Sequence, residues 1–445
     1  MVYIGIDIGK NENVIRFINK QGKEIRKKAK LKNNYYGFKE LKEIIEVLIE
    51  DNNLNSYDDI LVGVESTGHY WINLQQILNR LGIKRVVMVQ GTTVKTMRDL
   101  IASQKGKNDS IDSKAIAYSI KDGYYSEIMP KSIEVNSLKN MTRLRNELSE
   151  SLTSIKNKIH AWLDVNNQFY LIVFQHKLTI TGIKLLEKYP IPKDVLKINT
   201  REFIQDIMRD NPRIDRKKLM LYKEEVETWQ YYQMDISFPS KNEIKCYIES
   251  YKTLEKTINE LDKEIENLTI EIYGEQYKNL ASIKGIPNLN ISSLFAEIGD
   301  FKLFKNARML QSYAGLSIRA DSSATKVGES KITKKGNRRI RKNLYIITRQ
   351  LIVHNTEIKK LYCYYLSLER EKENRKIEMW IATMCKILRC IYGTMKNNSN
   401  FDTSEIFKTL DFSRCNMEKF NKLYMKKDVE KLIDENTNTT NKYKK

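Results

Sequence analysis

Apolar and polar residues alternate along roughly the first thirty positions of the chain, and this period of two predicts strands. Three such runs lie at Tyr3–Asp7, Glu12–Asn19 and Glu24–Lys30, with turn residues at Gly9-Lys10 and Gln21-Gly22 between them. Consecutive strands joined by short turns usually pair with each other. The sequence therefore predicts a three-stranded antiparallel meander at its start.

The spacing of apolar residues then lengthens to that of a helix over Tyr36–Glu50. Two more strands follow, at Ile60–Val64 and Arg85–Gln90, with a helix between them over Trp71–Leu81. Three strands, a helix, a strand, a helix and a strand is the element order of an RNase H-like fold. We therefore expect an α/β, RNase H-like (RuvC-like) domain over residues 1–165.

The rest of the chain is expected to be mainly α-helical. Apolar residues recur every three or four positions over Val135–Val165 and predict a core-packing helix, and a further helix is expected over Glu357–Thr394. A seven-residue repeat over Ile244–Ile272 predicts a coiled coil, whose partner is either the Val135–Val165 helix or a second subunit, and we favour the subunit. The expected parts after the first domain are a helical middle segment over 166–240, the coiled coil over 241–273, a mainly helical domain over 274–395 and a polar tail over 396–445.

The chain is strongly basic. Its 445 residues include 77 Lys and Arg against 56 Asp and Glu, which gives a formal net charge of +21. Eight basic residues fall within 326–342, where Glu329 is the only acid. Such a density suits contact with several phosphate groups, so nucleic acid is the expected partner.

Cysteine, histidine and apolar residues exclude other classes of protein. The five cysteines are an odd number without a C-x-x-C pair and do not form a disulfide framework, and the four histidines show no zinc pattern. The apolar run Phe169–Phe174 is far shorter than the ~20 residues that cross a bilayer. We therefore expect no membrane contact, a reducing cytoplasm and an oxygen-ligated metal.

Four acids are placed where they could share one site. Asp7 and Glu65 end two strands that lie side by side and parallel in an RNase H-like sheet, so their side chains meet at one edge. Asp109 is a natural N-cap for a helix over Ser110–Ile120, and Asp112 lies one turn further on. Four carboxylates of this kind can hold two divalent cations, Mg²⁺ or alternatively Mn²⁺, against a phosphate.

Basic residues in three places are candidates for phosphate contact. Lys107 and Lys114 flank the two aspartates. Leu280–Pro287 is similar to the turn of a helix-hairpin-helix motif and carries Lys284, although an ordinary turn between helices remains the alternative. The basic segment contributes the third set: Lys326, Lys331, Lys334, Lys335, Asn337, Arg338, Arg339, Arg341 and Lys342.

Ordered motifs across the chain resemble a known family. They are GIDIGK, VESTGHY, KNDSIDS, SIKGIP, YAGL, a serine loop and KITKKGNRRIR, and they run from about Tyr3 to Asn355. Together they resemble the DEDD transposases of the insertion-sequence 110 group, which are relatives of the Piv-type DNA invertases. The resemblance implies an acidic tetrad made of Asp7, Glu65, Asp109 and Asp112.

The same resemblance implies a nucleophilic serine in the C-terminal part of the chain. The family's serine falls on Ser323. The family usually has glycine after that serine, whereas this chain has Ala324, and Ser322 stands immediately before it. Ser322 therefore remains the alternative nucleophile.

The family also implies a mechanism and partners. It implies a recombinase in which serine attacks a DNA phosphodiester while acid-bound Mg²⁺ polarises it, giving a phosphoserine and a free 3′ hydroxyl. It further implies donor and target duplex DNA, a bridge RNA that selects them, and a dimer or tetramer with sites shared between subunits. Action on the nucleoid of a prokaryotic cell would follow.

Two other functions are compatible with parts of the sequence. GIDIGK also resembles the first phosphate strand of sugar kinases and actin-like ATPases, but no later D-x-G-G or adenosine-type glycine loop accompanies it. A RuvC-like nuclease without serine chemistry, or a non-catalytic binder of DNA and RNA, would share the acids and the basic segment. Covalent capture of DNA distinguishes a recombinase from either.

Overall fold

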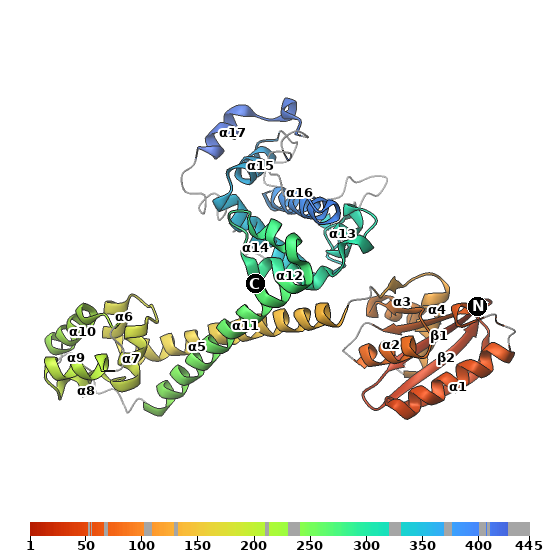
Figure 1. Cartoon of the computed structure of the whole chain (residues 1–445), viewed down its shortest axis with the longest axis horizontal. Coiled ribbons are helices and arrows are strands. Elements are labelled where there is room, and N and C mark those ends of the chain that lie inside the picture. The colour runs from red at the N-terminus through yellow and green to blue at the C-terminus, as the bar shows by residue number, and fades with distance from the viewer. Residues whose placement is uncertain are drawn as a thin grey trace. The chain divides into compact units, whose positions relative to one another are not determined.

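The computed structural model of the chain forms two compact units, Met1–Pro130 and Lys131–Lys445 (Figure 1). The structure describes residues 1–51, 54, 56–65, 70–101, 109–128, 132–209, 213–229, 241–319, 331–368, 376–399, 406 and 410–425. Each unit is described by itself below.

The first unit is built on one mixed sheet of six strands, in the order β3-β2-β1-β4-β5-β6. The first three strands pair antiparallel, β4 lies parallel to β1, β5 lies parallel to β4, and β6 pairs antiparallel with β5. The predicted meander and the two later strands are confirmed to within about two residues at their ends. Their bounds are β1 Val2–Ile8, β2 Glu12–Asn19, β3 Glu24–Lys32, β4 Ile60–Glu65, β5 Val86–Val89 and β6 Ser126–Glu127.

Helices cover both faces of this sheet. The face that carries Ile4, Ile6 and Val62 packs against the apolar sides of α1 and α2, and the face that carries Leu61 and Val87 packs against α3 and α4. Alternating strand residues therefore enter two separate cores. The arrangement is consistent with the expected RNase H-like domain. The helices are α1 Tyr35–Asp51, α2 Tyr70–Arg80, α3 Gly91–Ile101 and α4 Asp109–Lys121.

Two glycines bring α4 close to the centre of the sheet. A Cβ atom at Gly5 would overlap the Ser113 carbonyl oxygen and the Ala117 amide nitrogen. A Cβ at Gly63, on the neighbouring strand, would lie 2.6 Å from Cγ2 of Ile120. Glycine therefore lets the backbone of α4 rest directly on β1, and isoleucine side chains of α4 pack directly on β4.

The second unit contains two long helical elements, α5 (Ile133–Asn166) and α11 (Lys241–Ala281), which pack antiparallel to each other (Figure 1), and α11 is kinked at Gly274. Arg145 of α5 pairs with Asp262 of α11, and Lys156, further along α5, lies over the ring of Tyr251, which comes earlier in α11. The two helices therefore run in opposite directions. Both long helices were predicted. The heptad repeat of α11 pairs with α5 of the same chain, which was one of the two alternatives. A contact with a second subunit stays a prediction.

The segment between these two helices forms a helical lobe. Fully buried Tyr170, Phe203 and Tyr222 lie in a core that also takes residues from the end of α5 and the start of α11, such as Leu163 and Ile244. The segment that sequence reasoning left without a function therefore has its own core. Its helices are α6 Gln168–Phe174, α7 Ile180–Lys188, α8 Pro192–Leu196, α9 Thr200–Met208 and α10 Arg216–Thr228.

The C-terminal part of this unit is a further group of helices. The prediction of one helix over Glu357–Thr394 is wrong, because α15 ends at Ser367 and α16 begins at Lys376. Leu368 leaves the helical conformation and forms an isolated β-bridge with Cys415. The elements here are α12 Asn288–Ile298, α13 Ala307–Tyr313, β7 Ile318–Arg319, β8 Lys331–Ile332, α14 Arg338–His354, α15 Thr356–Ser367, α16 Lys376–Asn397 and α17 Met417–Tyr424.

None of the helices in the described ranges is both long enough and apolar enough to cross a membrane.

We expect Gly5→Ala to lower the stability of the first unit. The added methyl group must displace the backbone of α4, and overpacking of this kind costs about 1–3 kcal/mol. Gly393→Ala in α16 is the matched control, since its Cβ would meet no atom within 4 Å and alanine favours a helix. Urea unfolding of both variants checks this prediction, and equal midpoints would contradict the tight approach of α4.

Candidate functional site

Asp7 and Glu65 lie next to each other at the edge of the sheet. The parallel register places Ile6 opposite Val64, so the two acids follow at the next position on adjacent strands. Side chains that stand opposite in parallel strands project to the same face, and here it is the face that α4 covers. The expectation that these two acids share one edge of the sheet is therefore supported by the strand register.

The first turn of α4 lies at this same edge. At the other end of the helix, the Tyr118 hydroxyl donates a 2.8 Å hydrogen bond to the carbonyl of Gly22, in the turn beside the start of β1. The helix therefore runs opposite to β1, and Asp109 and Asp112 come to the carboxyl ends of the strands. The helix begins at Asp109 itself rather than after it, and the side chain of Asp109 lies outside the described residues.

Asp112 is held by an arginine that sequence reasoning did not identify. Nη1 of Arg98, in α3, donates to Oδ1 of Asp112 at 2.8 Å and to Oδ2 at 3.2 Å. The Asp112 side chain is only 13% exposed and that of Arg98 is 22% exposed. A carboxylate this far removed from water requires a cation or several hydrogen-bond donors, and the Arg98 guanidinium supplies the cation.

The acids fit a hard divalent cation by their chemistry, because every donor is a carboxylate oxygen. Among the side chains that the structure describes, no three of His, Cys, Asp and Glu gather as metal ligands would. Asp109 falls outside that set, and Asp112 is paired with Arg98. The Arg98 guanidinium would therefore lie beside any cation that Asp112 helped to hold.

Of the two lysines predicted to lie beside the acids, the structure describes Lys114. Lys107 lies outside the described residues. The ammonium of Lys114 lies 3.2 Å from Oε1 of Glu24, a residue of β3, and 6.0 Å from the centre of the Tyr118 ring. Lys114 therefore already has an acidic partner, and its phosphate contact stays a prediction.

The serine loop begins and ends at a short pair of strands. Ile318 of β7 pairs with Ile332 of β8, which brings the two ends of the loop together. Ser322, Ser323 and Lys326 lie outside the described residues, as does the side chain of Lys331.

The basic segment continues into α14, and its residues divide by exposure. Asn337 caps the helix, since its Oδ1 accepts from the amides of Arg339 at 2.9 Å and Ile340 at 3.3 Å. Arg341 donates to the carbonyl of Ala314 at 2.8 Å. Those two side chains have structural roles. The exposed side chains are Lys334, Lys335, Arg338 and Lys342, that of Arg339 is half-buried, and phosphate contact stays a prediction for the whole set.

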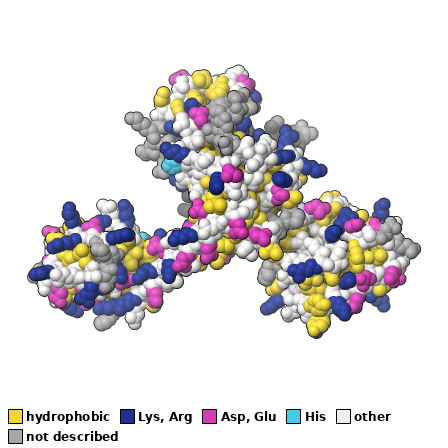
Figure 2. Space-filling model, in the orientation of Figure 1, with side chains coloured by type: hydrophobic (Ala, Val, Ile, Leu, Met, Phe, Trp, Pro, Cys, Tyr) yellow, Lys and Arg dark blue, Asp and Glu magenta, His cyan; other side chains and the backbone are white. Residues whose placement is uncertain are grey.

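Positive charge alone does not mark an interface on this chain. In Figure 2, Lys and Arg side chains are scattered over the visible face of every part rather than gathered in one patch. A binding site has to be inferred from particular residues.

The turn that carries Lys284 lies between two helices, as both the helix-hairpin-helix motif and an ordinary turn would require. It joins the end of α11 to α12, and Gly285 takes φ = +100° where a Cβ would lie 2.8 Å from that of His354. Glycine is therefore required there by conformation and by space. Lys284 is exposed, and its phosphate contact stays a prediction.

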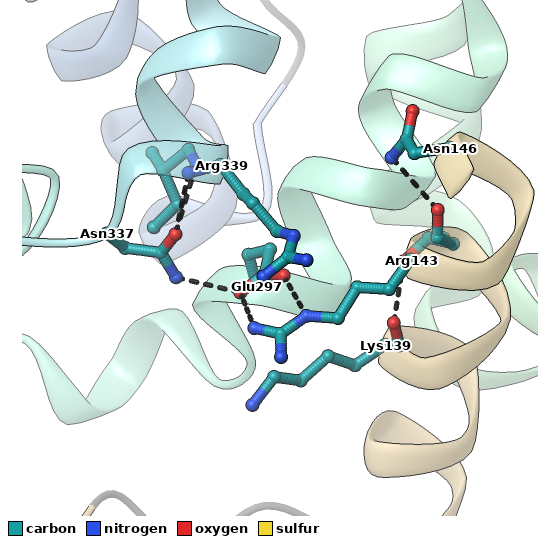
Figure 3. A network of polar contacts seen from close by, with 8 residues as sticks. Lys139, Arg143, Asn146, Glu297, Asn337 and Arg339 are labelled. Carbon is teal, nitrogen blue, oxygen red and sulfur yellow. Dashed lines mark hydrogen bonds and ion pairs between the residues drawn. The ribbon is translucent and has the colours of Figure 1, made fainter. Parts of the chain in front are cut away.

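A buried carboxylate joins three helices of the second unit (Figure 3). Glu297 of α12 is 2% exposed. Its Oε1 accepts from Nε of Arg143 in α5 at 2.7 Å, and its Oε2 accepts from Nη2 of Arg143 at 2.9 Å and from Nδ2 of Asn337 at 2.7 Å. The residue that caps α14 is thereby fixed to α5 and α12.

These contacts change the ionisation of Glu297. Burial by itself raises the pKa of the carboxyl group, but the hydrogen bonds from Arg143 and Asn337 and the positive charge of Arg143 outweigh burial. The pKa of Glu297 therefore lies below its ordinary value, and the group is ionised at neutral pH.

Comparison with known proteins identifies the family. A model of the DEDD transposases of the IS110 group, described as a transposase, matches residues 4–167. A second model, described as a transposase of the IS116/IS110/IS902 family, matches residues 277–363. The chain belongs to the IS110 family of transposases. The middle lobe of this IS110-family chain lies between the two matched ranges.

Individual relatives are more distant and match only in part. The transposase for insertion sequence element IS1111A of Coxiella burnetii is 22% identical over 275 residues, which are 61% of this chain and 63% of that protein. The pilin gene-inverting proteins of Moraxella bovis and Moraxella lacunata are each 28% identical over 168 residues, 36% of this chain and 51% of theirs. The chain thus spans less than two thirds of the length of these relatives.

Sequence reasoning missed Arg98, Arg143 and Glu297. Nothing local identifies either arginine, because their partners come from other helices, 14 and 154 positions away. Glu297 carries a usable signal, since it is the only charged residue in the otherwise apolar and polar-neutral α12. A lone acid in such a helix predicts a buried carboxylate that needs a cation.

We expect Arg98→Gln to destabilise the first unit in the absence of divalent metal. The Asp112 carboxylate would lose its cation in a mostly buried position, at a cost of about 2 kcal/mol. Urea unfolding in EDTA measures the loss. The double variant Arg98→Gln/Asp112→Asn should recover most of it, and an unchanged loss in the double variant would show that the pair is not its source.

Glu297 should make stability depend on pH. Since its folded pKa is depressed, the ionised group adds stability that is fully present above the unfolded pKa of about 4.3 and is lost as pH falls through the lower folded value. The difference in melting temperature between the wild type and Glu297→Gln should therefore be constant from about pH 7 to 5 and shrink below about pH 4.3. A constant difference down to pH 3 would contradict it.

Proposed function

We propose that the protein is a DNA recombinase that inserts and excises a mobile element by cutting and rejoining DNA strands. The observation that carries this proposal is the match of residues 4–167 and 277–363 to models of IS110-family transposases. By their names, one relative serves an insertion sequence and two invert a pilin gene, and both activities rearrange DNA. The basic segment and the acids at one sheet edge agree with this function.

The acids supply the metal chemistry in this proposal. Asp7, Glu65, Asp109 and Asp112 would hold Mg²⁺ or Mn²⁺, and the bound cations would stabilise charge on the attacking and leaving oxygens. Asp7 and Glu65 are the best supported members, since adjacent strands place them on one face. The RNase H-like assignment of the first unit belongs to the same proposal, and the strand order supports it.

Ser323 is the proposed nucleophile. Its Oγ forms a bond to phosphorus as its proton leaves, the bond from phosphorus to O3′ breaks, and the departing oxygen takes up a proton to become the 3′ hydroxyl. The product is a phosphoserine that keeps the energy of the phosphodiester for rejoining. Serine has a high pKa and requires activation, which is the reason for metal-binding acids in the same enzyme.

The partners belong to the proposal as well. Donor and target duplex DNA are implied by the family, and a bridge RNA from the element would select them. A dimer or tetramer would let the acids of one subunit act with the serine of another. The antiparallel pairing of α5 and α11 leaves outward positions on both helices for such a contact, among them the 48% exposed Leu144.

Covalent capture of DNA tests this function. We expect wild-type protein with Mg²⁺, element-end DNA and RNA transcribed from the flanking non-coding region to give a protein–DNA adduct. Ser323→Ala should lose the adduct and lower strand exchange by roughly a thousandfold or more, and Asp7→Ala should abolish cleavage as well. Gel analysis of labelled DNA after protease treatment measures both.

The neighbouring serine provides the control. Ser322→Ala should leave the adduct in place, because it keeps the proposed nucleophile. Loss of the adduct in Ser322→Ala but not in Ser323→Ala would transfer the role to Ser322. Cleavage that persists in Ser323→Ala without any adduct would instead identify a metal-dependent nuclease.

A further inference from the structure

More positive charge surrounds Glu297 than its carboxylate needs. Arg143 already satisfies it with two hydrogen bonds, and Asn337 adds a third. Figure 3 shows two more cations beside this group: Lys139 extends from α5 next to the Arg143 guanidinium, and Arg339 extends from α14 towards the same carboxylate. Lys139, Arg143 and Arg339 around Glu297 are called the cationic cluster below.

The surplus is unfavourable for the protein alone. A buried carboxylate is compensated by one well-placed cation, so three cations leave two charges unbalanced. Burial and the charges of Arg143 and Arg339 lower the pKa of Lys139, and the attraction of Glu297 opposes this only in part. No carboxylate among the described residues forms an ion pair with the Lys139 ammonium. Its position is therefore not explained by the fold.

An ion pair between the two long helices, α5 and α11, has one cation for one acid. Arg145, two positions further along α5 from Arg143, donates to Asp262 of α11 at 2.7 Å and 3.1 Å. That contact has the same bidentate form, with one cation and one acid. A surplus of cations is therefore not a general requirement for joining helices in this unit.

The cluster lies at the beginning of α14, where a ligand's negative charge would be favoured. Arg339 is in the first turn of this 17-residue helix, whose N-terminus has partial positive character. Exposed Lys334, Lys335 and Arg338 lie just before it or beside it in the chain. The cluster therefore continues the basic segment onto α5.

We propose that Lys139, Arg143 and Arg339 form a binding site for one backbone phosphate of a nucleic acid, with Glu297 holding the site in shape. Arginine forks and a lysine ammonium suit the oxygens of a phosphodiester. A single phosphate would balance part of the surplus charge, and the neighbouring lysines would meet phosphates further along the strand. The nucleic-acid partner rests on the proposed function, whereas strand cleavage does not enter the inference.

The competing explanation is a purely structural cluster, and Lys139 separates the two. Lys139→Gln removes a cation without touching the hydrogen bonds of Glu297. If the role is structural, the variant should lose stability. If the role is phosphate binding, its stability should equal or exceed that of the wild type, because a repulsive charge is removed, while nucleic-acid affinity falls.

The experiment measures binding of the full chain, in EDTA, to a duplex DNA and to an RNA hairpin between 50 and 200 mM salt. We expect Lys139→Gln to weaken binding about five- to tenfold at low salt and to reduce the slope of log affinity against log salt by about one. Lys139→Arg should retain binding. Lys263→Gln removes an exposed lysine from α11 and should behave as the wild type.

The outcomes separate the possibilities. The proposal is overturned if Lys139→Gln binds both nucleic acids as Lys263→Gln does, or if its melting temperature falls in step with its affinity. If Lys139→Gln weakens binding to the duplex DNA, the phosphate belongs to DNA. If it weakens binding to the RNA hairpin, the phosphate belongs to RNA. Because no cleavage occurs in EDTA, failure of the serine chemistry would leave this result intact, and a wild-type response here would leave the recombinase proposal intact.

Discussion

The parallel pairing of β1 with β4 is the constraint on which the acidic site depends. It sets Asp7 and Glu65 side by side on one face of the sheet. A slip of one residue would turn Glu65 into the apolar core beneath α1 and α2, where an unpaired carboxylate costs far more than the roughly 2–7 kcal/mol of an unpaired neutral polar group. Gly5 and Gly63 are opposite each other in this register and lie on the face that α4 covers. Because both lack a side chain, α4 can pack closely there.

In the second unit the corresponding constraint is the ion pair of Glu297 with Arg143. Removing the arginine would leave a carboxylate that is 2% exposed without the cation that donates hydrogen bonds to it, and breaking a buried pair of this kind costs about 3–5 kcal/mol. Asn337 extends the effect, since its Oδ1 caps α14 while its Nδ2 holds the carboxylate. The N-terminus of α14 is thus fixed to a buried carboxylate, and this contact holds the basic residues of its first turn in a fixed orientation.

The sequence predicted those features that depend on local periodicity. The strands β1 to β5 and the long helices α5 and α11 follow from repeats of two, three to four, and seven residues, so they were found with small errors at their ends. The continuous helix across Leu368 was wrong, because the break depends on a bridge to Cys415, 47 positions later. A tertiary contact of that kind leaves no periodic trace in the chain.

The residues of the acidic site also divide into those that the sequence could place and those that depend on tertiary contacts. Asp7 and Glu65 could be placed from the sheet topology, because parallel strands bring their carboxyl ends together. Arg98 could not, since its pairing with Asp112 depends on how α3 packs against α4. The family resemblance, rather than any physical pattern, selected Ser323 from among the loop serines.

Arg98 gives the acidic site a property that the tetrad alone would not have. Two carboxylates 4 Å apart repel each other by about 4 kcal/mol for an effective dielectric constant near 20. A guanidinium that already neutralises Asp112 lowers this cost while the protein is free of metal.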